Sequence, residues 1–361
     1  MVYAKGVLRD LAAGRSAGRR PRLWLRSGGV ALVAFGALLA WPASSGASPQ
    51  SITLYNGQHI QTTNALVNAF EKKTGITVNV RSQTEDTFTD QIIAEGSRSP
   101  ADVFYTENSP PLEELASKGM LSTVKASTLA HTDAHYDSPD GTWAAVSARV
   151  SVLVYNTSLV KRSQLPSSVM ALADPKWRGK LALAPGETDF QPIVTSVERT
   201  YGKAAALRWL DGLKANAGSH IYPDNETVTS QVNAGQVAIG IVNQYYWYRL
   251  RAQLGGGGMH SDIAYFSPHN AGYVVDVSGI GVLRSSSRQS AAQRFVAFVV
   301  SPQGQGIIAH SNSFEYPLDS GVSAAAKGEA PFARLQPNAV TVAELGTGAG
   351  AISLLQEAQL L

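Results

Sequence analysis

Two adjacent tyrosines, Tyr245 and Tyr246, follow residues 237–242, an apolar run typical of a buried strand. On a strand, neighbouring side chains point to opposite faces, whereas in the first turn of a helix they lie about 100° apart and can converge. We therefore predict a strand-to-helix junction here, at which both phenol oxygens can bind one ligand. A phenol with a pKa of about 10 binds metals poorly unless a trivalent cation, which prefers anionic oxygen, stabilises the phenolate. The alternative for the Tyr-Tyr-Trp-Tyr run at 245–248 is core packing or a carbohydrate-stacking surface.

The segment that begins near residue 50 alternates between strand and helix patterns, and two polar side chains follow its strands. His59 comes after the first strand and Glu107 after the third. This order predicts a mainly parallel sheet with helices on both faces, and such sheets bind ligands beyond the carboxyl ends of their strands. Taken alone, His59 is typical of a surface or core histidine, and Glu107 of a water-facing carboxylate at a helix start. The predicted strands are residues 52–55, 76–80 and 102–105, and the predicted helices start near Thr62, Glu85 and Leu112.

A second lobe is predicted to begin near residue 150, where an apolar strand over 150–155 precedes further alternation of strand and helix patterns. Asn225 is a candidate N-cap for a helix that ends at Gly235, and a strand over 274–283 returns the chain to the first lobe. The other predicted elements are strands at 181–184 and 237–242 and helices from about 190, over 203–214, over 226–234 and over 290–300. The predicted lobes are residues 48–148 with 275–325, and 149–274 with 326–361.

Residues 1–47 are predicted to be a secretory signal peptide. They carry seven basic residues and one acidic residue, then an apolar run over 28–40 and a small-residue stretch that offers cleavage after Ala47. The apolar run is short for a bilayer span, although an N-terminal membrane anchor is the alternative. Without this segment the chain has 23 basic and 26 acidic residues, so nucleic-acid binding loses its electrostatic support. The absence of cysteine excludes disulfides, cysteine-ligated metals, thiol catalysis and a lipid-modified N-terminal cysteine.

Three motifs that contain the candidate ligands resemble those of one known family. They are YNGQH at 55–59, PADVFYTE at 100–107 and NQYYWY at 243–248. In this combination they are similar to the ferric-iron-binding periplasmic proteins of ABC importers. The DPKWRGK stretch at 174–180 and residues 309–318 also resemble that family, so the resemblance covers nearly all of the chain after the predicted signal peptide.

The resemblance implies a type II-like periplasmic binding protein: an α/β fold with two lobes, each a mainly parallel sheet flanked by helices, joined by hinge strands that close around Fe(III). It implies that His59 and Glu107 bind the metal from the first lobe and Tyr245 and Tyr246 from the second. One carboxylate and two phenolates then balance three positive charges, and water or a small anion such as carbonate fills the other two octahedral positions. The implied partners of this periplasmic monomer are an inner-membrane ABC permease and its ATPase, with no nucleic acid.

The expected anion site departs from the family pattern. Members that hold phosphate use a Ser-Gly-Ala-type stretch before a helix, where N–H groups suit an anion, but this chain has Glu187, Thr188 and Asp189 there. Their carboxylates should repel phosphate. Arg149 is expected to pair with carbonate instead, or to neutralise Glu187 or Asp189. The matching amide donors are Asn225, which has Glu226 beside it, and Asn243.

Two other functions remain open from the sequence. A binding protein of the same fold for a polyamine, thiamine or an organophosphonate would use the aromatic run for stacking and Glu187, Asp189 and Glu226 for an amine. A secreted iron enzyme would keep a coordination position open for oxygen, but two phenolates stabilise Fe(III) over Fe(II) and hinder redox cycling. After residue 47 the sequence contains neither a G-x-S-x-G nor an H-E-x-x-H motif. We therefore predict a binding protein and not an enzyme.

Overall fold

The computed structural model describes residues 50–323 and 328–361. The predicted signal peptide, residues 1–47, lies outside the described residues. Within them, no helix has both the length and the apolar character needed to cross a bilayer. The strands are β1 (Ser51–Asn56), β2 (Thr77–Ser82), β3 (Val103–Thr106), β4 (Leu121–Ser122), β5 (Trp143–Asn156), β6 (Leu181–Ala182), β7 (Ile239–Asn243), β8 (Ser261–Ala264), β9 (Val275–Leu283) and β10 (Tyr316–Pro317). The helices are α1 (Ile60–Thr74), α2 (Glu85–Glu95), α3 (Pro110–Ser117), α4 (Ala126–Leu129), α5 (Gln191–Tyr201), α6 (Lys203–Ala217), α7 (Asn225–Asn233), α8 (Gln244–Leu254), α9 (Gln289–Val300), α10 (Pro302–Ala309), α11 (Val342–Leu345) and α12 (Ala349–Glu357).

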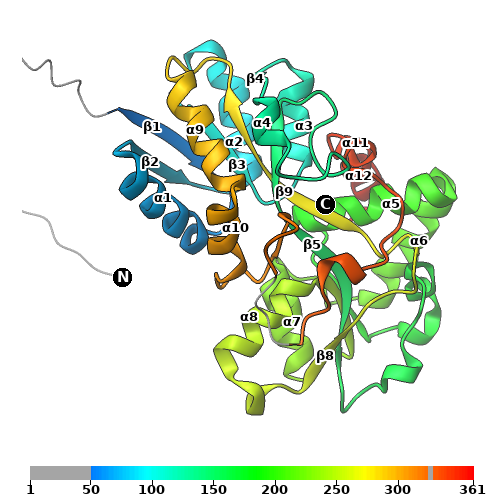
Figure 1. The fold of residues 1–361 in the computed structure, drawn as a ribbon. Coiled ribbons are helices and arrows are strands. Elements are labelled where there is room, and N and C mark those ends of the chain that lie inside the picture. The colour runs from blue at the N-terminus through cyan, green and yellow to red at the C-terminus, as the bar shows by residue number, and fades with distance from the viewer. Residues whose placement is uncertain (1–49, 324–327) are drawn as a thin grey trace, which may run out of the picture. The chain divides into compact units, whose positions relative to one another are not determined.

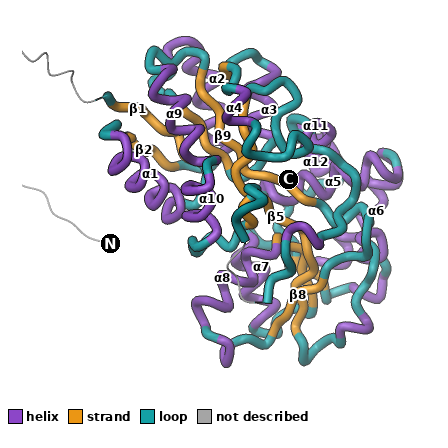
Figure 2. Tube along the Cα trace, viewed as in Figure 1, coloured by secondary structure: helices purple, strands orange, loops and turns teal. Residues whose placement is uncertain are grey.

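The strands follow the order β2-β1-β3-β9-β5-β7-β6, with β10 and β8 on β5 and β4 on β9 (Figures 1 and 2). Pairing is parallel between β1 and its neighbours β2 and β3, and between β6 and β7, whereas the pairs that involve β5 or β9 are antiparallel. We call β1–β4, β9 and β10 the first strand group and β6–β8 the second strand group. The long β5 belongs to both, because it pairs with β9 through residues 143–150 and with β7 through residues 151–155.

This arrangement confirms the predicted fold class, in which parallel strands with flanking helices are joined by long connecting strands. The predicted lobe boundaries, 48–148 with 275–325 and 149–274 with 326–361, stay a prediction. The alternation of the first strand group was predicted to within about two residues, and α2 begins at the predicted Glu85. Gly75, with a left-handed φ of 70°, closes α1. α1 begins two residues earlier than predicted, which makes His59 its N-cap.

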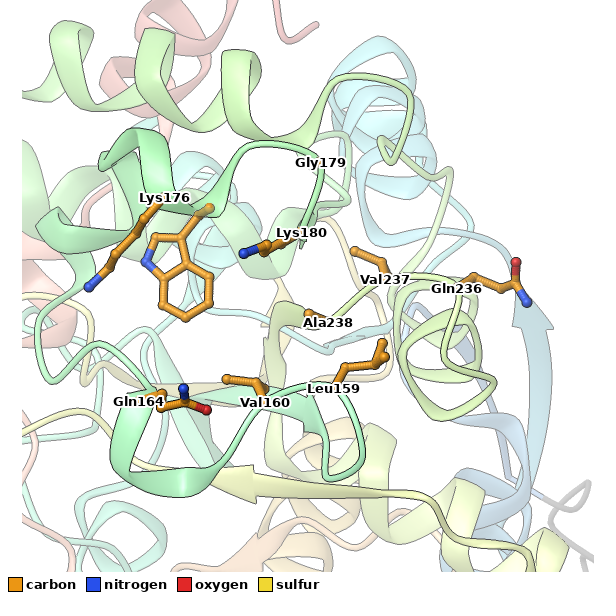
Figure 3. Close-up of a pocket in the computed structure, with 10 residues that line it drawn as sticks. Leu159, Val160, Gln164, Lys176, Gly179, Lys180, Gln236, Val237 and Ala238 are labelled. Atoms are coloured by element: carbon orange, nitrogen blue, oxygen red, sulfur yellow. The ribbon is translucent and has the colours of Figure 1, made fainter.

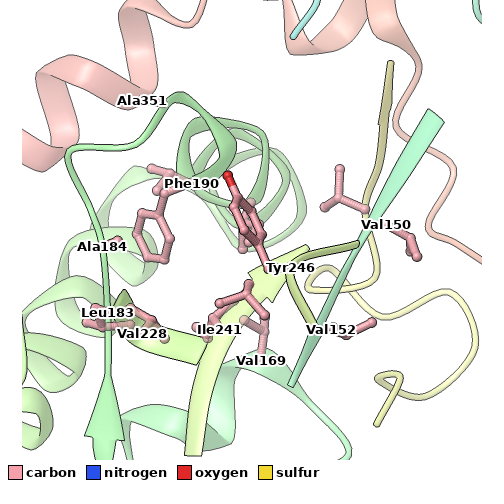
Figure 4. Packing of buried hydrophobic residues seen from close by; sticks show 14 of the residues in the cluster. Val150, Val152, Val169, Leu183, Ala184, Phe190, Val228, Ile241, Tyr246 and Ala351 are labelled. Carbon is pink, nitrogen blue, oxygen red and sulfur yellow. The ribbon is translucent and has the colours of Figure 1, made fainter. Parts of the chain in front are cut away.

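Apolar packing anchors the two adjacent tyrosines. Tyr245 and Tyr246 belong to a core cluster that also contains Val152, Phe190 and Ile241. Figure 4 shows the Tyr246 ring between Phe190 and Val150, with its hydroxyl oxygen at the end that faces away from Ile241. The rings are therefore held by burial, which leaves the oxygens as the parts available for chemistry. A separate cluster packs α1 and α9 on the first strand group.

The N-cap of α7 is Asp224, so the prediction that Asn225 caps this helix is wrong. The Asp224 side chain accepts a hydrogen bond of 2.6 Å from the backbone N–H of Thr227, and Asn225 is the first helical residue. A carboxylate satisfies a free N–H of the first turn and also interacts favourably with the helix dipole. Asn225 does not cap the helix, and its side-chain amide donates instead to Oδ2 of Asp189.

Replacing Asp224 with alanine should lower the free energy of unfolding by about 1 kcal/mol, because α7 loses its N-terminal cap. Urea unfolding followed by circular dichroism measures the change. Asp224→Asn keeps an accepting oxygen and should recover most of the loss. Equal destabilisation by the two substitutions would show that the cap hydrogen bond is not the cause.

Candidate metal centre

The tyrosine pair lies at the predicted strand-to-helix junction. β7 ends at Asn243, which is the N-cap of α8, and Tyr245 and Tyr246 occupy the first turn of that helix. Their ring centroids are 4.1 Å apart. Both hydroxyls donate to the same carboxylate oxygen, Oδ2 of Asp189, at 3.2 Å from Tyr245 and 2.9 Å from Tyr246. The two phenol oxygens therefore converge on one point, as the sequence predicted.

The two side chains predicted from the first lobe meet the tyrosine pair. His59 precedes α1, and Glu107 follows β3, so both lie beyond the carboxyl ends of parallel neighbours β1 and β3. Nε2 of His59 lies 2.8 Å from Oε1 of Glu107, and the same Oε1 is 3.4 Å from the Tyr245 hydroxyl. The four predicted ligands thus form one connected cluster around Tyr245 and Asp189.

Asp189, which was expected to lie beside an anion, lies in direct contact with both tyrosine hydroxyls. It occupies a short 3-10 turn, Thr188–Phe190, that leads into α5, and it is 7 % exposed. Besides both tyrosine hydroxyls, its Oδ2 accepts from Nδ2 of Asn225 at 3.3 Å. Its Oδ1 has no hydrogen-bond partner among the described residues. A buried carboxylate oxygen without a partner is costly, and its position beside two phenols marks it as a further oxygen donor.

The ionisable groups of this cluster depart strongly from their ordinary pKa values. Burial, followed by the charge of Asp189, raises the pKa of both tyrosine hydroxyls well above the usual range. Burial also opposes ionisation of Glu107, but the neighbouring His59 outweighs it, with help from two arginines, and lowers the pKa of Glu107 to about 2. Without a metal, the phenols therefore keep their protons and donate hydrogen bonds to the Asp189 carboxylate.

Two arginines contribute positive charge to the cluster. Arg249, which no sequence motif indicated, lies in contact with Nε2 of His59 and pairs with Oε1 of Glu226 at 3.0 Å. Its guanidinium carbon lies 4.7 Å from the centre of the Tyr245 ring. Arg149 is fully buried, forms its ion pair with Glu315 and lies 5.7 Å from the centre of the Tyr245 ring. Long-range packing, which no local pattern encodes, determines both pairings. The charge of Arg149 also favours the ionised form of Asp189, which opposes the effect of burial on the pKa of that carboxyl. The pairing of Arg149 with carbonate stays a prediction.

The remaining predicted residues surround the cluster without joining it. Glu187 and Thr188 line a cavity of about 400 Å³ that also reaches Glu107. Burial, then the charges of Asp189 and Glu107, raises the pKa of Glu187 to about 8. Asn243 makes no side-chain capping hydrogen bond. The predicted role of Glu187, Thr188 and Asn243 beside an anion therefore stays a prediction.

A second cavity lies elsewhere on the second strand group. It has a volume of about 370 Å³, and Figure 3 shows Lys176 and Lys180 on one side of it and Leu159 and Val160 on the other. The candidate ligands are not among the residues that line it. It includes part of the 174–180 motif, but it is separate from the tyrosine pair.

The donor set determines which metal this cluster could take. Within residues 50–323 and 328–361, no three or more histidine, aspartate and glutamate side chains are arranged to hold a metal by themselves. The candidate donor set of this cluster therefore includes the two tyrosine oxygens, which converge on Asp189. Two phenolates, carboxylates and one imidazole are hard, largely anionic donors, and they suit a trivalent cation better than a soft or divalent one.

An α/β fold with long connecting strands and a polar cluster beyond its strand ends is the arrangement expected of a solute-binding protein. The chain belongs to the bacterial extracellular solute-binding protein family, whose sequence profile matches residues 98–340, and within it to the ferric-iron-binding periplasmic proteins that the motifs resemble. It is 37 % identical over 335 residues to the Fe(3+)-binding periplasmic protein of Serratia marcescens, covering 92 % of this chain and 98 % of that one. It is 35 % identical to the major ferric iron-binding protein of Neisseria meningitidis serogroup B, covering 89 % and 97 %. The structure of iron-bound HitA from Pseudomonas aeruginosa aligns with a TM-score of 0.81 at 40 % identity, covering 86 % and 99 %.

Proposed function

We propose that this protein is a periplasmic substrate-binding protein that binds Fe(III) and delivers it to an ABC permease with its ATPase. The ligands are His59, Glu107, Tyr245 and Tyr246. The observation that carries the proposal is the convergence of two buried phenol oxygens on one point, with an imidazole and a carboxylate in contact with it. The names of the relatives, which include a Fe(3+)-binding periplasmic protein and an iron-bound structure, support the same cargo.

Asp189 supplies a fifth donor in this proposal, in the place where the family pattern has an external anion. Its Oδ1 is unpartnered and its Oδ2 already faces both tyrosines. Two phenolates and two carboxylates give a charge of −4 against +3 for the metal. Arg149 and Arg249 lie close enough to Tyr245 to stabilise the one excess negative charge, although each also pairs with a carboxylate, of Glu315 and Glu226 respectively. No carbonate or phosphate is then required, and water is sufficient for the last octahedral position.

Closure follows from the placement of the ligands. His59 and Glu107 follow strands of the first strand group, whereas the tyrosines follow β7 of the second. A metal that binds both sets has a higher affinity for the form in which they meet, and so it shifts the protein toward that form. The permease is proposed to recognise this closed form, which makes the protein a carrier and not an enzyme.

The geometry disfavours the amine-binding alternative. Tyr245, Tyr246, Trp247 and Tyr248 are 0–7 % exposed, so their rings offer little surface for stacking. The arginine side chain of Arg249 already lies over the faces of Tyr245 and Tyr246. A polyamine or thiamine would have to displace a cation of this chain to reach the same rings.

Metal analysis combined with a visible spectrum tests the function. Protein purified without chelator should contain about one iron per chain by the proposed stoichiometry, and it should absorb visible light through phenolate-to-iron charge transfer. Excess citrate should remove both the iron and the colour. A colourless protein that takes up ferric ion without a visible band would exclude phenolate ligation, and turnover of an oxidisable substrate would favour an iron enzyme.

Iron affinity should rise with pH, because binding must release the protons that the two tyrosine hydroxyls keep in the metal-free protein. Two protons per metal predict that affinity falls about 100-fold for each pH unit of acidification near neutrality. Competition with citrate, corrected for the protonation of citrate, measures this slope. A pH-independent affinity would show that the phenols do not ionise on binding.

A further inference from the structure

A buried hydrogen-bond network connects the backbones of His59 and Glu107 to residues that are not proposed ligands. Its centre is the ion pair between Arg149 of β5 and Glu315, which are 0 % and 2 % exposed. Glu315 immediately precedes β10, and β10 pairs with residues 147–148 of β5. The pair therefore lies on the segments that connect the two strand groups, and neither member is among the proposed ligands.

One arm of this network reaches His59. Nε2 of Gln58 donates to both carboxylate oxygens of Glu315, at 3.4 and 3.3 Å. Oε1 of Gln58 accepts a hydrogen bond of 2.7 Å from the backbone N–H of His59. Gln58 is 5 % exposed, so its amide is held between the Glu315 carboxylate and the His59 backbone. The Gln58 side chain therefore fixes the position of the His59 backbone N–H.

The other arm reaches Glu107. Nη1 of Arg149 donates to Oδ1 of Asn108 at 3.0 Å, and Nδ2 of Asn108 donates to Oε1 of Glu85 at 2.9 Å. Oε2 of Glu85 accepts from the backbone N–H groups of Glu107 and Asn108, at 2.8 and 2.9 Å. A buried carboxylate with three N–H donors thus holds the Glu107 loop by its backbone.

The two arms also meet through close packing. A Cβ atom on Gly57 would lie 2.8 Å from Cβ of Glu85, a distance that real side chains do not tolerate. Gly57 therefore permits the start of α2 to approach the loop that carries His59. The loops of both first-lobe ligands rest on the same residue, Glu85.

We propose that Gln58 and Glu85 are positioning residues that place His59 and Glu107 for the metal, with the Arg149–Glu315 pair as their common anchor. The proposal rests on the proposed function, since it assigns these residues a role in iron binding. Neither residue is proposed to touch the metal: Gln58 acts through His59, and Glu85 acts through Glu107. Loss of such an outer partner costs about 10–100-fold in metal affinity where it has been measured in other sites.

A double-mutant cycle tests the first arm, with ferric ion supplied as ferric citrate and citrate as the competitor. Gln58→Met removes the amide at similar volume and should weaken iron binding by about 10-fold or more. In the His59→Ala background the same substitution should change affinity by less than about 2-fold, because the group it positions is gone. The proposal would be overturned if Gln58→Met lowered iron affinity as much in the His59→Ala background as in the wild type, or if it left the affinity of the wild type unchanged.

Matched variants distinguish a loss of positioning from a folding defect and from failure of the proposed ligand set. Gln293→Met removes another buried glutamine, 8 % exposed, whose amide bonds the backbone of Thr123 and Lys125 and not a ligand loop. It should lower thermal stability and leave iron affinity unchanged, and an equal loss of iron affinity would refute positioning. If Gln58→Met fails to fold, a second double-mutant cycle measures iron affinity for Glu85→Gln alone and in the Glu107→Ala background. If His59→Ala and Glu107→Ala both leave affinity unchanged, the proposed ligand set fails before the positioning question arises.

Discussion

Replacing Tyr246 with phenylalanine should lower Fe(III) affinity by more than about 100-fold, since losing a charged ligand costs more than losing an outer partner. The ring would stay in its packing with Phe190 and Ile241, so folding should change little. The visible charge-transfer band should weaken and shift, because one phenolate remains on Tyr245. Citrate competition and absorption spectra of the loaded protein measure the two effects.

Tyr248→Phe is the matched control for this result. Tyr248 lies in the same helix and is 6 % exposed, but its hydroxyl is not part of the cluster around Asp189. It should bind iron as the wild type does. If Tyr246→Phe retains the affinity and spectrum of Tyr248→Phe, the assignment of the phenolate ligands is wrong.

Replacing Asp189 with alanine should make iron binding depend on an added anion. In buffer free of carbonate and phosphate, affinity should fall by about 100-fold, because a charged oxygen donor is lost from a buried position. Bicarbonate or phosphate should restore much of this loss, since a small anion can enter the vacated space near Asn225. The wild type should respond to neither anion.

Glu187→Gln separates this effect from a general change of polarity in the same segment. Glu187 lies two residues away and lines the neighbouring cavity, whereas the carboxylate that accepts from both tyrosine hydroxyls is that of Asp189. The Glu187→Gln variant should remain independent of added anion. Anion dependence of the wild-type protein, or none in Asp189→Ala, would exclude Asp189 as the replacement for an external anion.

The sequence was most informative where structure and chemistry depend on neighbouring residues. The junction before Tyr245 was predictable because an apolar strand pattern ends just before the pair, and adjacent side chains converge only in a helix. His59 and Glu107 were predictable as candidates because each follows a strand, and parallel strands present their carboxyl ends at one edge. These inferences need only local periodicity and the rule for where such sheets bind ligands.

The contacts that complete the site could not be predicted in this way. Gln58 and Glu315 are 257 positions apart, and Arg249 and His59 are 190 apart, so their pairing depends on the finished fold. Arg149 carries a charge that suits several acids, and only packing selects Glu315 over Asp189. Asp189 was predictable only as a carboxylate near the expected anion site. Its contact with both tyrosine hydroxyls depends on the finished fold.

β9 pairs with β3 and β5, which precede it in the sequence by more than 100 residues. This separation also affects the order in which the strands can pair during synthesis. β3 is bordered by β1 on one side and by β9 on the other, with Val103 opposite Val282. While the chain is being synthesised, β1, β2 and β3 can pair early, but the outer edge of β3 stays bare until residues 275–283 exist. An unpaired edge invites association with other chains. A chain with this topology therefore benefits from remaining unfolded until β9 has been made.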